Sequence, residues 1–157
     1  MVIYLGIGTN LGDRDAHLQT ALQLLDERVG ERLACSSVYR SAPQGFVSDN
    51  EFANIVAVYE TEYSPEEVLL LTQQMEREMG RTEKSVNGVY HDRVIDIDLL
   101  LAHVGNRESG VGKRIEYTSE TLTLPYPRMQ EREFVMIPLR EVEQILNASA
   151  NNAQPIT

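Results

Sequence analysis

The residues best suited to chemistry lie in the segment Arg93–Leu101 (RVIDIDLLL), where Ile or Leu recurs at every second position from Ile95 onward. This alternation predicts a β-strand. Because side chains two positions apart on a strand share a face, Asp96 and Asp98 point the same way, with attachment points roughly 6.6–6.8 Å apart. Two carboxylates about 7 Å apart repel by roughly 2–3 kcal/mol at an effective dielectric of about 20. A divalent cation would convert this repulsion into attraction, and Mg²⁺ prefers carboxylates combined with substrate phosphates.

A locally cationic segment precedes the two aspartates. Four basic and three acidic residues lie between Arg77 and Arg93, within a chain whose formal net charge is -10. Arg93 is a fixed cation suited to a phosphate, and Arg81 and Lys84 lie in the same segment. These residues favour a phosphoryl-transfer site. The alternative, a half-buried strand whose aspartates only face water, stays open on the residues alone.

The elements expected around this strand follow a recognisable order. Hydrophobic periodicity and turn residues predict strands at 2–9, 32–40, 51–61 and 93–101, and helices at 13–28 and 65–79. The order strand–helix–strand–strand–helix–strand is that of a ferredoxin-like β-α-β-β-α-β core in an α+β fold. After it we expect a hairpin or long loop at 102–119, an extended segment at 121–125, and a C-terminal helix at 128–145 that bends near Pro138.

The second predicted helix carries the clearest boundary signals of the chain. Ser64 is the expected N-cap, Pro65 occupies the first helical position, and Glu67 completes a capping box. Gly80 follows the helix as a typical C′ residue.

Three glycines near the start suggest a dinucleotide-binding loop as an alternative. Gly6, Gly8 and Gly12 have the spacing GxGxxxG, whereas the dinucleotide fingerprint is GxGxxG. The segment Val38–Ser41, where a second strand would end, carries no acidic residue for a ribose. The sequence therefore disfavours this alternative.

Asn54 is unusual inside an apolar strand, because a buried amide needs hydrogen-bonding partners. Those partners are either a neighbouring loop or a ligand. The residues themselves leave both open.

Composition limits the remaining classes. The 157 residues suffice for one domain, which we expect to span 1–146, followed by a polar, disordered tail at 147–157. The net charge of -10 argues against nucleic acid and anionic membranes as partners. One cysteine excludes an internal disulfide, and no signal peptide or membrane span is visible, so we expect a cytoplasmic protein. The sequence does not determine the oligomeric state, for which we expect a monomer.

Several longer motifs together resemble a known family. LGIGTNLGDR, YRSAPQG, EFANIVA, DRVIDIDLLL and LTLPYPRMQEREFVMIPL occur in this order between Val2 and Val142. With these motifs the chain resembles the 6-hydroxymethyl-7,8-dihydropterin pyrophosphokinases of folate biosynthesis. The resemblance implies a ferredoxin-like fold and transfer of a pyrophosphoryl group from ATP to the pterin hydroxymethyl group, giving AMP and the pterin diphosphate.

The resemblance also implies roles for individual residues. Asp96 and Asp98 would hold two Mg²⁺ ions, and Arg81 and Arg93 would join them in catalysis. The residues implied to bind ATP are Gln73, Glu76, Arg81, Lys84, Arg93, Leu99 (through its backbone), Thr123, Tyr126 and Arg132. The residues implied to bind the pterin are Ser41, Ala42, Pro43, Gln44, Gly45, Phe52, Asn54 and Phe134, with the two phenylalanines stacking on the ring.

Two other function classes remain open beside the enzyme. One is a non-catalytic relative that binds a pterin or a nucleotide. The other is a ferredoxin-like interaction domain in which the aspartate pair has no ligand. Turnover, and binding of ATP with Mg²⁺ or of a pterin, would separate these classes.

Overall fold

The structure, a computed structural model, describes residues 1–41, 51–80, 94–106 and 110–152. Its central element is an antiparallel sheet in the order β2-β4-β1-β5-β6, with β3 paired to β4. The strands are β1 (Val2–Thr9), β2 (Glu31–Cys35), β3 (Tyr39–Ser41), β4 (Phe52–Glu60), β5 (Asp96–Asn106) and β6 (Gly110–Arg114). The first, second, fourth and fifth of these, with α1 (Arg14–Arg28) and α2 (Pro65–Glu78), make up the predicted ferredoxin-like core.

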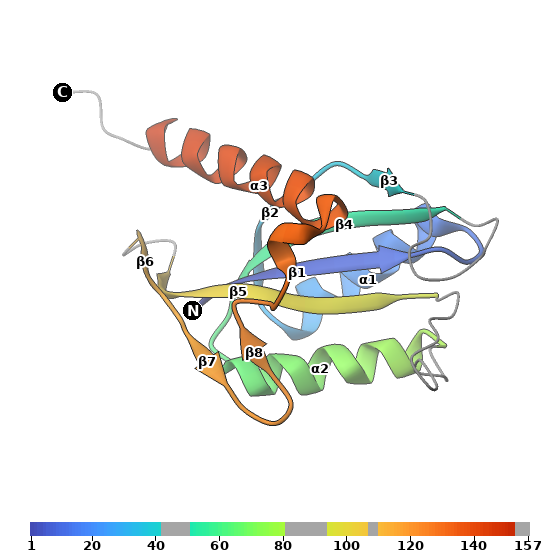
Figure 1. The fold of residues 1–157 in the computed structure, drawn as a ribbon, viewed down its shortest axis with the longest axis horizontal. Helices are drawn as coiled ribbons and strands as arrows, with labels where there is room; N and C mark the ends of the chain where they lie inside the picture. Colours follow the sequence, from blue (N-terminus) through green and yellow to red (C-terminus); the bar gives the residue numbers. More distant parts are fainter. Residues whose placement is uncertain (42–50, 81–93, 107–109, 153–157) are drawn as a thin grey trace.

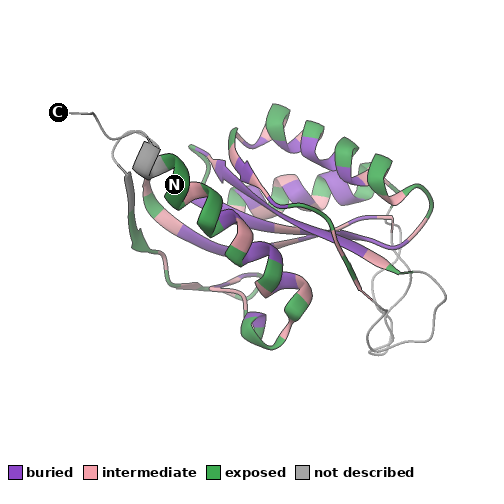
Figure 2. Ribbon diagram, turned by 90° about the horizontal axis from the view of Figure 1, so that it is seen from above, coloured by how far each residue is buried: buried purple, intermediate pink, exposed green. Residues whose placement is uncertain are grey.

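Helices cover both faces of the sheet. Figure 1 shows α3 (Glu133–Asn152) on one side of the sheet and α2 on the other. The core on the α1/α2 side includes Ile3, Leu5 and Ile7, whereas the core on the α3 side includes Val2 and Tyr4. Alternate residues of β1 thus pack into opposite layers, which explains why the whole strand is apolar. Figure 2 shows the buried residues concentrated along the central strands and on the inward sides of the helices.

Both core helices begin at side-chain caps, of which the cap of α2 was predicted. The Asp13 carboxylate accepts a hydrogen bond from the Ala16 backbone N–H at 3.1 Å. At α2 the Ser64 hydroxyl accepts from the Glu67 N–H at 3.2 Å, and the Glu67 carboxylate accepts from the Ser64 N–H at 3.0 Å. The capping box is therefore confirmed.

Several boundaries differ from those predicted. The expected strand at 32–40 divides into β2 and β3, because Ser36 turns its side chain onto β4 and accepts from the Val56 N–H at 3.0 Å. β5 starts at Asp96 rather than Arg93 and continues to Asn106, where it pairs with β6. The predicted hairpin region also contains β7 (Tyr117–Thr118), which pairs with β8 (Thr123–Leu124).

The C-terminal region is also more helical than predicted. A short 3₁₀ turn at Met129–Glu131 precedes α3, which accommodates Pro138 and continues to Asn152. The expectation of a disordered tail was therefore wrong for residues 147–152, and residues 153–157 lie outside the described part. Among the described residues, no helix combines the length and the apolar character needed to cross a membrane.

The dinucleotide-loop alternative is excluded by the sheet. β1 pairs antiparallel with both β4 and β5, and Gly6 and Gly8 lie inside this strand rather than in a turn. A dinucleotide fold would place these glycines between a parallel strand and a helix.

Candidate active site

The two aspartates lie on the α3 side of the sheet, near the start of β5. Ile97 and Leu99, which alternate with them, are buried in the α1/α2 layer, so Asp96 and Asp98 face the opposite way. Both carboxylates are partly exposed. The prediction that they share one face is confirmed.

Two glycines of β1 lie opposite the two aspartates of β5. In the register, Asp98 lies opposite Gly6 and Asp96 lies opposite Gly8. On the other side of β1, Gly8 lies opposite Asn54 of β4. The row Asp96–Gly8–Asn54 spans two strand separations, or roughly 10 Å. The predicted metal residues and the predicted pterin amide are thus neighbours on one face.

Gly8 leaves room for the Asn54 side chain. A Cβ atom added at Gly8 would lie only 2.6 Å from Asn54 Oδ1, closer than any real Cβ contact. At Gly6 the nearest atoms are Leu100 side-chain carbons at 3.4 Å, an almost ordinary contact. Gly8 is therefore required by its neighbour's side chain rather than by a turn.

Asn54 is held at the base of the predicted pterin site. Its side chain is buried, with 8% exposed, and its Nδ2 lies 3.5 Å from the Ser41 hydroxyl of β3. Ser41 lies opposite Phe52 in the β3–β4 ladder. Ser41, Phe52 and Asn54 are therefore brought together as predicted, while Ala42, Pro43, Gln44 and Gly45 lie outside the described residues.

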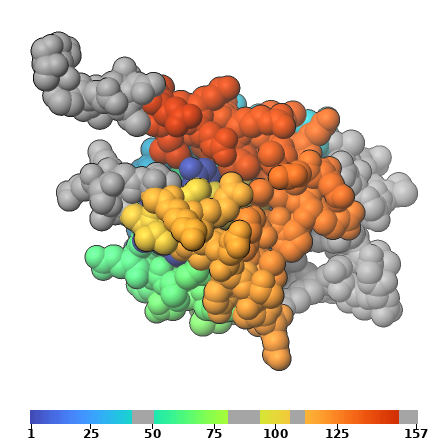
Figure 3. Space-filling view, turned by 60° about the vertical axis from the view of Figure 1, so that its left-hand side comes forward, coloured from blue at the N-terminus to red at the C-terminus, as the bar shows by residue number. Residues whose placement is uncertain are grey.

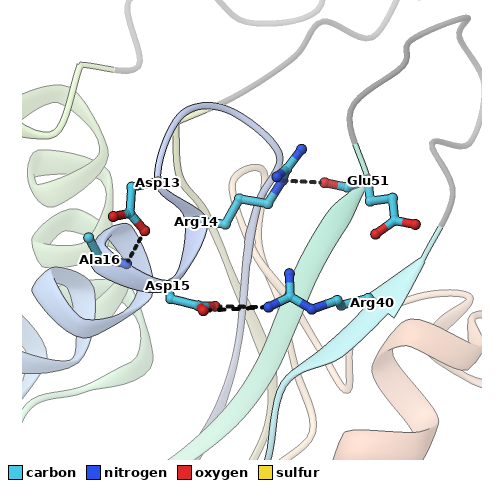
Figure 4. Close-up of polar contacts among 6 residues, drawn as sticks. All are labelled: Asp13, Arg14, Asp15, Ala16, Arg40 and Glu51. Atoms are coloured by element: carbon cyan, nitrogen blue, oxygen red, sulfur yellow. Dashed lines mark hydrogen bonds and ion pairs between the residues drawn. The ribbon is translucent and has the colours of Figure 1, made fainter.

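The first residues of α1 contact the end of β3 and the residue before β4, beside this site. The Arg14 guanidinium donates to the Glu51 carbonyl oxygen at 2.7 Å, and Arg40 pairs with Asp15 at 3.2 Å (Figure 4). Arg40 lies in β3 next to Ser41, and Glu51 directly precedes β4. These contacts fix the position of the two strands that carry Ser41 and Phe52.

Two aromatic rings and an arginine lie on the α3 side of the site. Phe134 and Tyr126 pack against the core on the α3 side of the sheet. The Arg132 guanidinium carbon lies 5.8 Å from the centre of the Phe134 ring and 5.9 Å from that of Tyr126. Both distances are within cation–π range, so the two rings orient the arginine. The predicted pterin ring partner and the predicted phosphate cation are thus adjacent.

A second group of predicted residues lies along β5 on the α2 side. Glu76 of α2 is buried, and its carboxylate accepts a hydrogen bond from the Ile97 backbone N–H at 2.9 Å. Gln73, one turn earlier on the helix, is partly exposed. Leu99 is only 3% exposed and belongs to the core on the α1/α2 side. The contact predicted between its backbone and ATP stays a prediction.

A small hairpin adjoins the same edge of β5. Thr123 lies in β8, and the Tyr126 N–H donates to the Leu100 carbonyl oxygen at 2.7 Å. Glu76 and Tyr126 therefore each hydrogen-bond the backbone of β5, while Gln73 lies on the same helix as Glu76 and Thr123 lies on β8. Arg81, Lys84 and Arg93 lie outside the described residues.

The donor set at the aspartates fits magnesium. Within the described ranges, no group of three or more His, Cys, Asp or Glu side chains could hold a metal by itself. Two carboxylates on one face suit Mg²⁺, which usually binds one or two carboxylates and completes its shell with water and substrate phosphates. Asp96 and Asp98 would hold such an ion only in combination with a ligand.

Gly6 and Gly8 belong to the site, although the sequence suggested for them only a dinucleotide loop, which it disfavoured. The two glycines have the same two-residue period as Asp96 and Asp98, which is the spacing of one strand face. That shared period is the signal in the sequence that could have placed them opposite the aspartates.

Comparison with known proteins identifies the family of the chain. The family model for 7,8-dihydro-6-hydroxymethylpterin-pyrophosphokinase (HPPK) matches residues 4–144. The 2-amino-4-hydroxy-6-hydroxymethyldihydropteridine pyrophosphokinase of Porphyromonas gingivalis is 44% identical over 149 residues, which cover 95% of each chain. The Bacillus subtilis protein of the same name is 35% identical over 154 residues, covering 98% of this chain and 84% of its own.

A solved structure shares the fold. The crystal structure of an HPPK-DHPS protein in complex with substrates superposes with a TM-score of 0.63 over 96% of this chain, at 12% sequence identity. The matched part is 43% of that longer protein, so the likeness concerns the fold of one portion of it. From the family match and the two relatives, the chain belongs to the 7,8-dihydro-6-hydroxymethylpterin-pyrophosphokinase family.

Proposed function

We propose that this chain transfers a pyrophosphoryl group from ATP to the hydroxymethyl group of 6-hydroxymethyl-7,8-dihydropterin, with Mg²⁺ bound at Asp96 and Asp98. Its family carries out pyrophosphate transfer to this class of pterin in folate biosynthesis. ATP as the donor, two metal ions, AMP as the second product and each residue role below are parts of the proposal. So are a monomeric state, one domain over 1–146 and a cytoplasmic location.

The observation that carries the proposal is the position of the aspartate pair between two groups of predicted ligand residues. Across β1 lie Asn54 and its neighbours, suited to a flat heterocycle with hydrogen-bonding edges. Along β5 and α2 lie Glu76 and the partly exposed Gln73, two of the residues predicted to bind the nucleotide. A phosphate chain that joins the two sites would have to pass the aspartates.

On the pterin side, this chain's residues bind and orient the acceptor. The Asn54 amide offers a donor and an acceptor to the edge of the heterocycle, and burial fixes its direction. The Phe134 ring provides an apolar surface for stacking. Holding the acceptor alcohol beside the phosphates supplies much of the rate enhancement expected for a transfer of this kind.

On the phosphate side, the residues balance charge. Arg132, oriented by two rings, can direct its planar guanidinium at phosphate oxygens. Asp96 and Asp98 would hold the metal, which when bound draws negative charge from the phosphates. Arg81, Lys84 and Arg93 would add further cations. This machinery works through position and charge rather than through a covalent protein intermediate.

Phosphorus NMR tests the proposal directly. Purified protein is incubated with ATP, Mg²⁺ and 6-hydroxymethyl-7,8-dihydropterin, and with each of the three omitted in turn. We expect AMP to form in equal amount to a new pterin diphosphate only when all three are present. ADP formation would instead indicate attack at the γ-phosphorus. Absence of pterin-dependent ATP consumption would reject the enzyme in favour of a binding protein.

A further inference from the structure

The described part of the chain contains a polar cluster that no predicted role uses. Glu66, in the first turn of α2, accepts hydrogen bonds from Tyr117 at 3.0 Å, from Thr121 at 2.9 Å and from the Ser119 hydroxyl. Its three donors come from the β7–β8 hairpin, more than fifty positions later in the chain. We call Glu66 and these three residues the hydroxyl clamp. Figure 3 shows the hairpin, in orange, against the start of α2, in green.

The clamp acts on the turn of the hairpin. Ser119 closes the turn by donating its N–H to the Leu122 carbonyl oxygen at 2.8 Å. Its hydroxyl also accepts from the Thr121 and Leu122 N–H groups, at 3.2 and 3.1 Å. Through Ser119, the Glu66 carboxylate is therefore connected to the backbone of the turn as well as to its side chains.

Apart from Glu66, the hairpin is held by its own short ladder, by buried leucines, and by backbone hydrogen bonds to β5 from Ile115 before it and Tyr126 after it. Each of its strands is two residues long, and the ladder contains only two residue pairs. Leu122 and Leu124 are buried in the core on the α1/α2 side of the sheet, which fixes how deeply the hairpin sits. Apolar contacts are non-directional, so the hydrogen bonds to Glu66 determine how the hairpin is placed along α2.

The clamp joins the two elements that carry predicted nucleotide residues. The hairpin carries Thr123, and α2 carries Gln73 and Glu76. Glu66 and Gln73 are seven positions apart, so they lie on one face of α2, roughly 10 Å apart along the axis. Glu66 is thus too far from Gln73 to contact the same ligand, although both residues lie on the same face of α2.

From this arrangement we propose that Glu66 is a positioning residue for ATP binding: it sets the distance between Thr123 and the nucleotide residues of α2. This inference rests on the proposed function of the site. The cluster is chemically suited to the role, because a carboxylate that accepts from several hydroxyls forms charge-assisted hydrogen bonds. Those hydrogen bonds also lower the pKa of Glu66, with the bond from the Ser119 hydroxyl having the largest effect.

The neighbouring residue provides a matched control. Glu67 lies in the same turn of α2, is also acidic and also has a lowered pKa, but its hydrogen bonds go to Ser64 in the capping box. A Glu67→Gln substitution perturbs the helix start without touching the hairpin. A Glu66→Gln substitution removes the charge that receives the hydroxyls and leaves the capping box in place.

The experiment compares Glu66→Gln, Glu67→Gln, Thr121→Val and Thr121→Ser with the unmodified protein, by steady-state kinetics and thermal unfolding. For Glu66→Gln and Thr121→Val we expect a KM for ATP raised about three- to tenfold, as for loss of one hydrogen bond. The KM for the pterin should change little, and the Tm should fall about as much as in Glu67→Gln, because both substitutions remove a carboxylate with a lowered pKa. Thr121→Ser, which keeps the hydroxyl, should restore the KM for ATP. Glu67→Gln should lower the Tm and leave the KM for ATP unchanged.

A merely structural role would give a different pattern. If Glu66→Gln raised both KM values equally, or left the KM for ATP unchanged, the positioning role would be overturned. Calorimetry with a non-hydrolysable ATP analogue separates this outcome from failure of the proposed function. If the unmodified protein bound the analogue without turning over, weaker binding by Glu66→Gln alone would still support the clamp. No binding by the unmodified protein would overturn both proposals.

Discussion

The Glu76 carboxylate accepts a hydrogen bond from the Ile97 backbone N–H at 2.9 Å, and Ile97 is the residue between Asp96 and Asp98. A helix on one face of the sheet thereby fixes the short piece of backbone whose side chains project from the other face. Glu76 is buried, so its oxygen meets little competition from water. The contact couples the α2 residues that are predicted to bind the nucleotide to the proposed metal site.

This contact predicts a stability difference between two substitutions at Glu76. Glu76→Ala leaves the Ile97 N–H without this acceptor and should reduce the free energy of unfolding by about 1–3 kcal/mol. Glu76→Gln keeps an oxygen at the same distance and should recover most of that loss. Urea denaturation of both variants measures the difference. Equal destabilisation by Ala and Gln would mean that the charge of Glu76, not its hydrogen bond, holds β5.

The aspartates should control the dependence on magnesium. Asp96→Asn and Asp98→Asn should each remain folded and lose turnover by orders of magnitude, because a neutral amide is a poor ligand for Mg²⁺. Rates measured over a magnesium titration, with circular dichroism as the folding control, test this. Near-native activity in either variant would place the metal elsewhere.

Addition of a single methyl group at Gly8 and at Gly6 should affect pterin affinity differently. Gly8→Ala should weaken pterin binding, because the new Cβ would displace the Asn54 amide that lies 2.6 Å from it. Gly6→Ala is the control on the same strand face, where the nearest atoms are at 3.4 Å, and its effect should be smaller. Calorimetry measures the pterin affinity of both variants. Similar losses at both positions would show that Asn54 does not recognise the pterin.

Removal of the Phe134 ring should separate the two substrates. Phe134→Ala should weaken pterin binding by roughly 1–3 kcal/mol through loss of stacking and apolar contact. ATP affinity should change less, since Tyr126 still contacts Arg132. If both ligands were weakened equally, Phe134 would serve as a core residue rather than as a ring partner.

Acid should destabilise the protein through the start and the end of α2. The pKa values of Glu66, Glu67 and Glu78 are lowered from 4.5, by hydrogen bonds from Ser119, from Ser64 and from Arg28 respectively. A carboxyl with a lowered pKa in the folded state stabilises above its unfolded pKa, and this stabilisation is lost as pH falls through the folded value. The Tm should therefore drop below about pH 4.5.

The matching measurement follows the Tm from neutral to acid pH in the native protein and in a Glu66→Gln, Glu67→Gln double variant. In the double variant the Tm should fall less steeply with decreasing pH, because only Glu78 of the three carboxyls remains. If the Tm fell equally steeply in both proteins, other groups would be responsible for the sensitivity to acid.

Local patterns in the sequence predicted what depends on neighbours along the chain. The shared face of Asp96 and Asp98 follows from strand geometry alone, and the capping box of α2 follows from Ser64 and Glu67. Both were confirmed by the structure. The element order also sufficed for the ferredoxin-like core.

What the sequence did not predict depends on contacts between distant segments. The division of β2 from β3 results from the hydrogen bond between Ser36 and Val56, on another strand. The Glu66 clamp requires the hairpin to fold back over more than fifty residues. The requirement for glycine at position 8 comes from the facing Asn54, a register that no local pattern contains.

The space that Gly8 leaves for Asn54 has a consequence for inhibitors of the proposed reaction. A compound that binds the Asn54 amide above Gly8 depends on a position where any side chain would move its own hydrogen-bonding partner. A resistant variant with a substitution at Gly8 would displace the inhibitor and the natural pterin together. Under drug pressure, escape through this part of the site would carry a matching loss of fitness, so resistance should arise at other contacts.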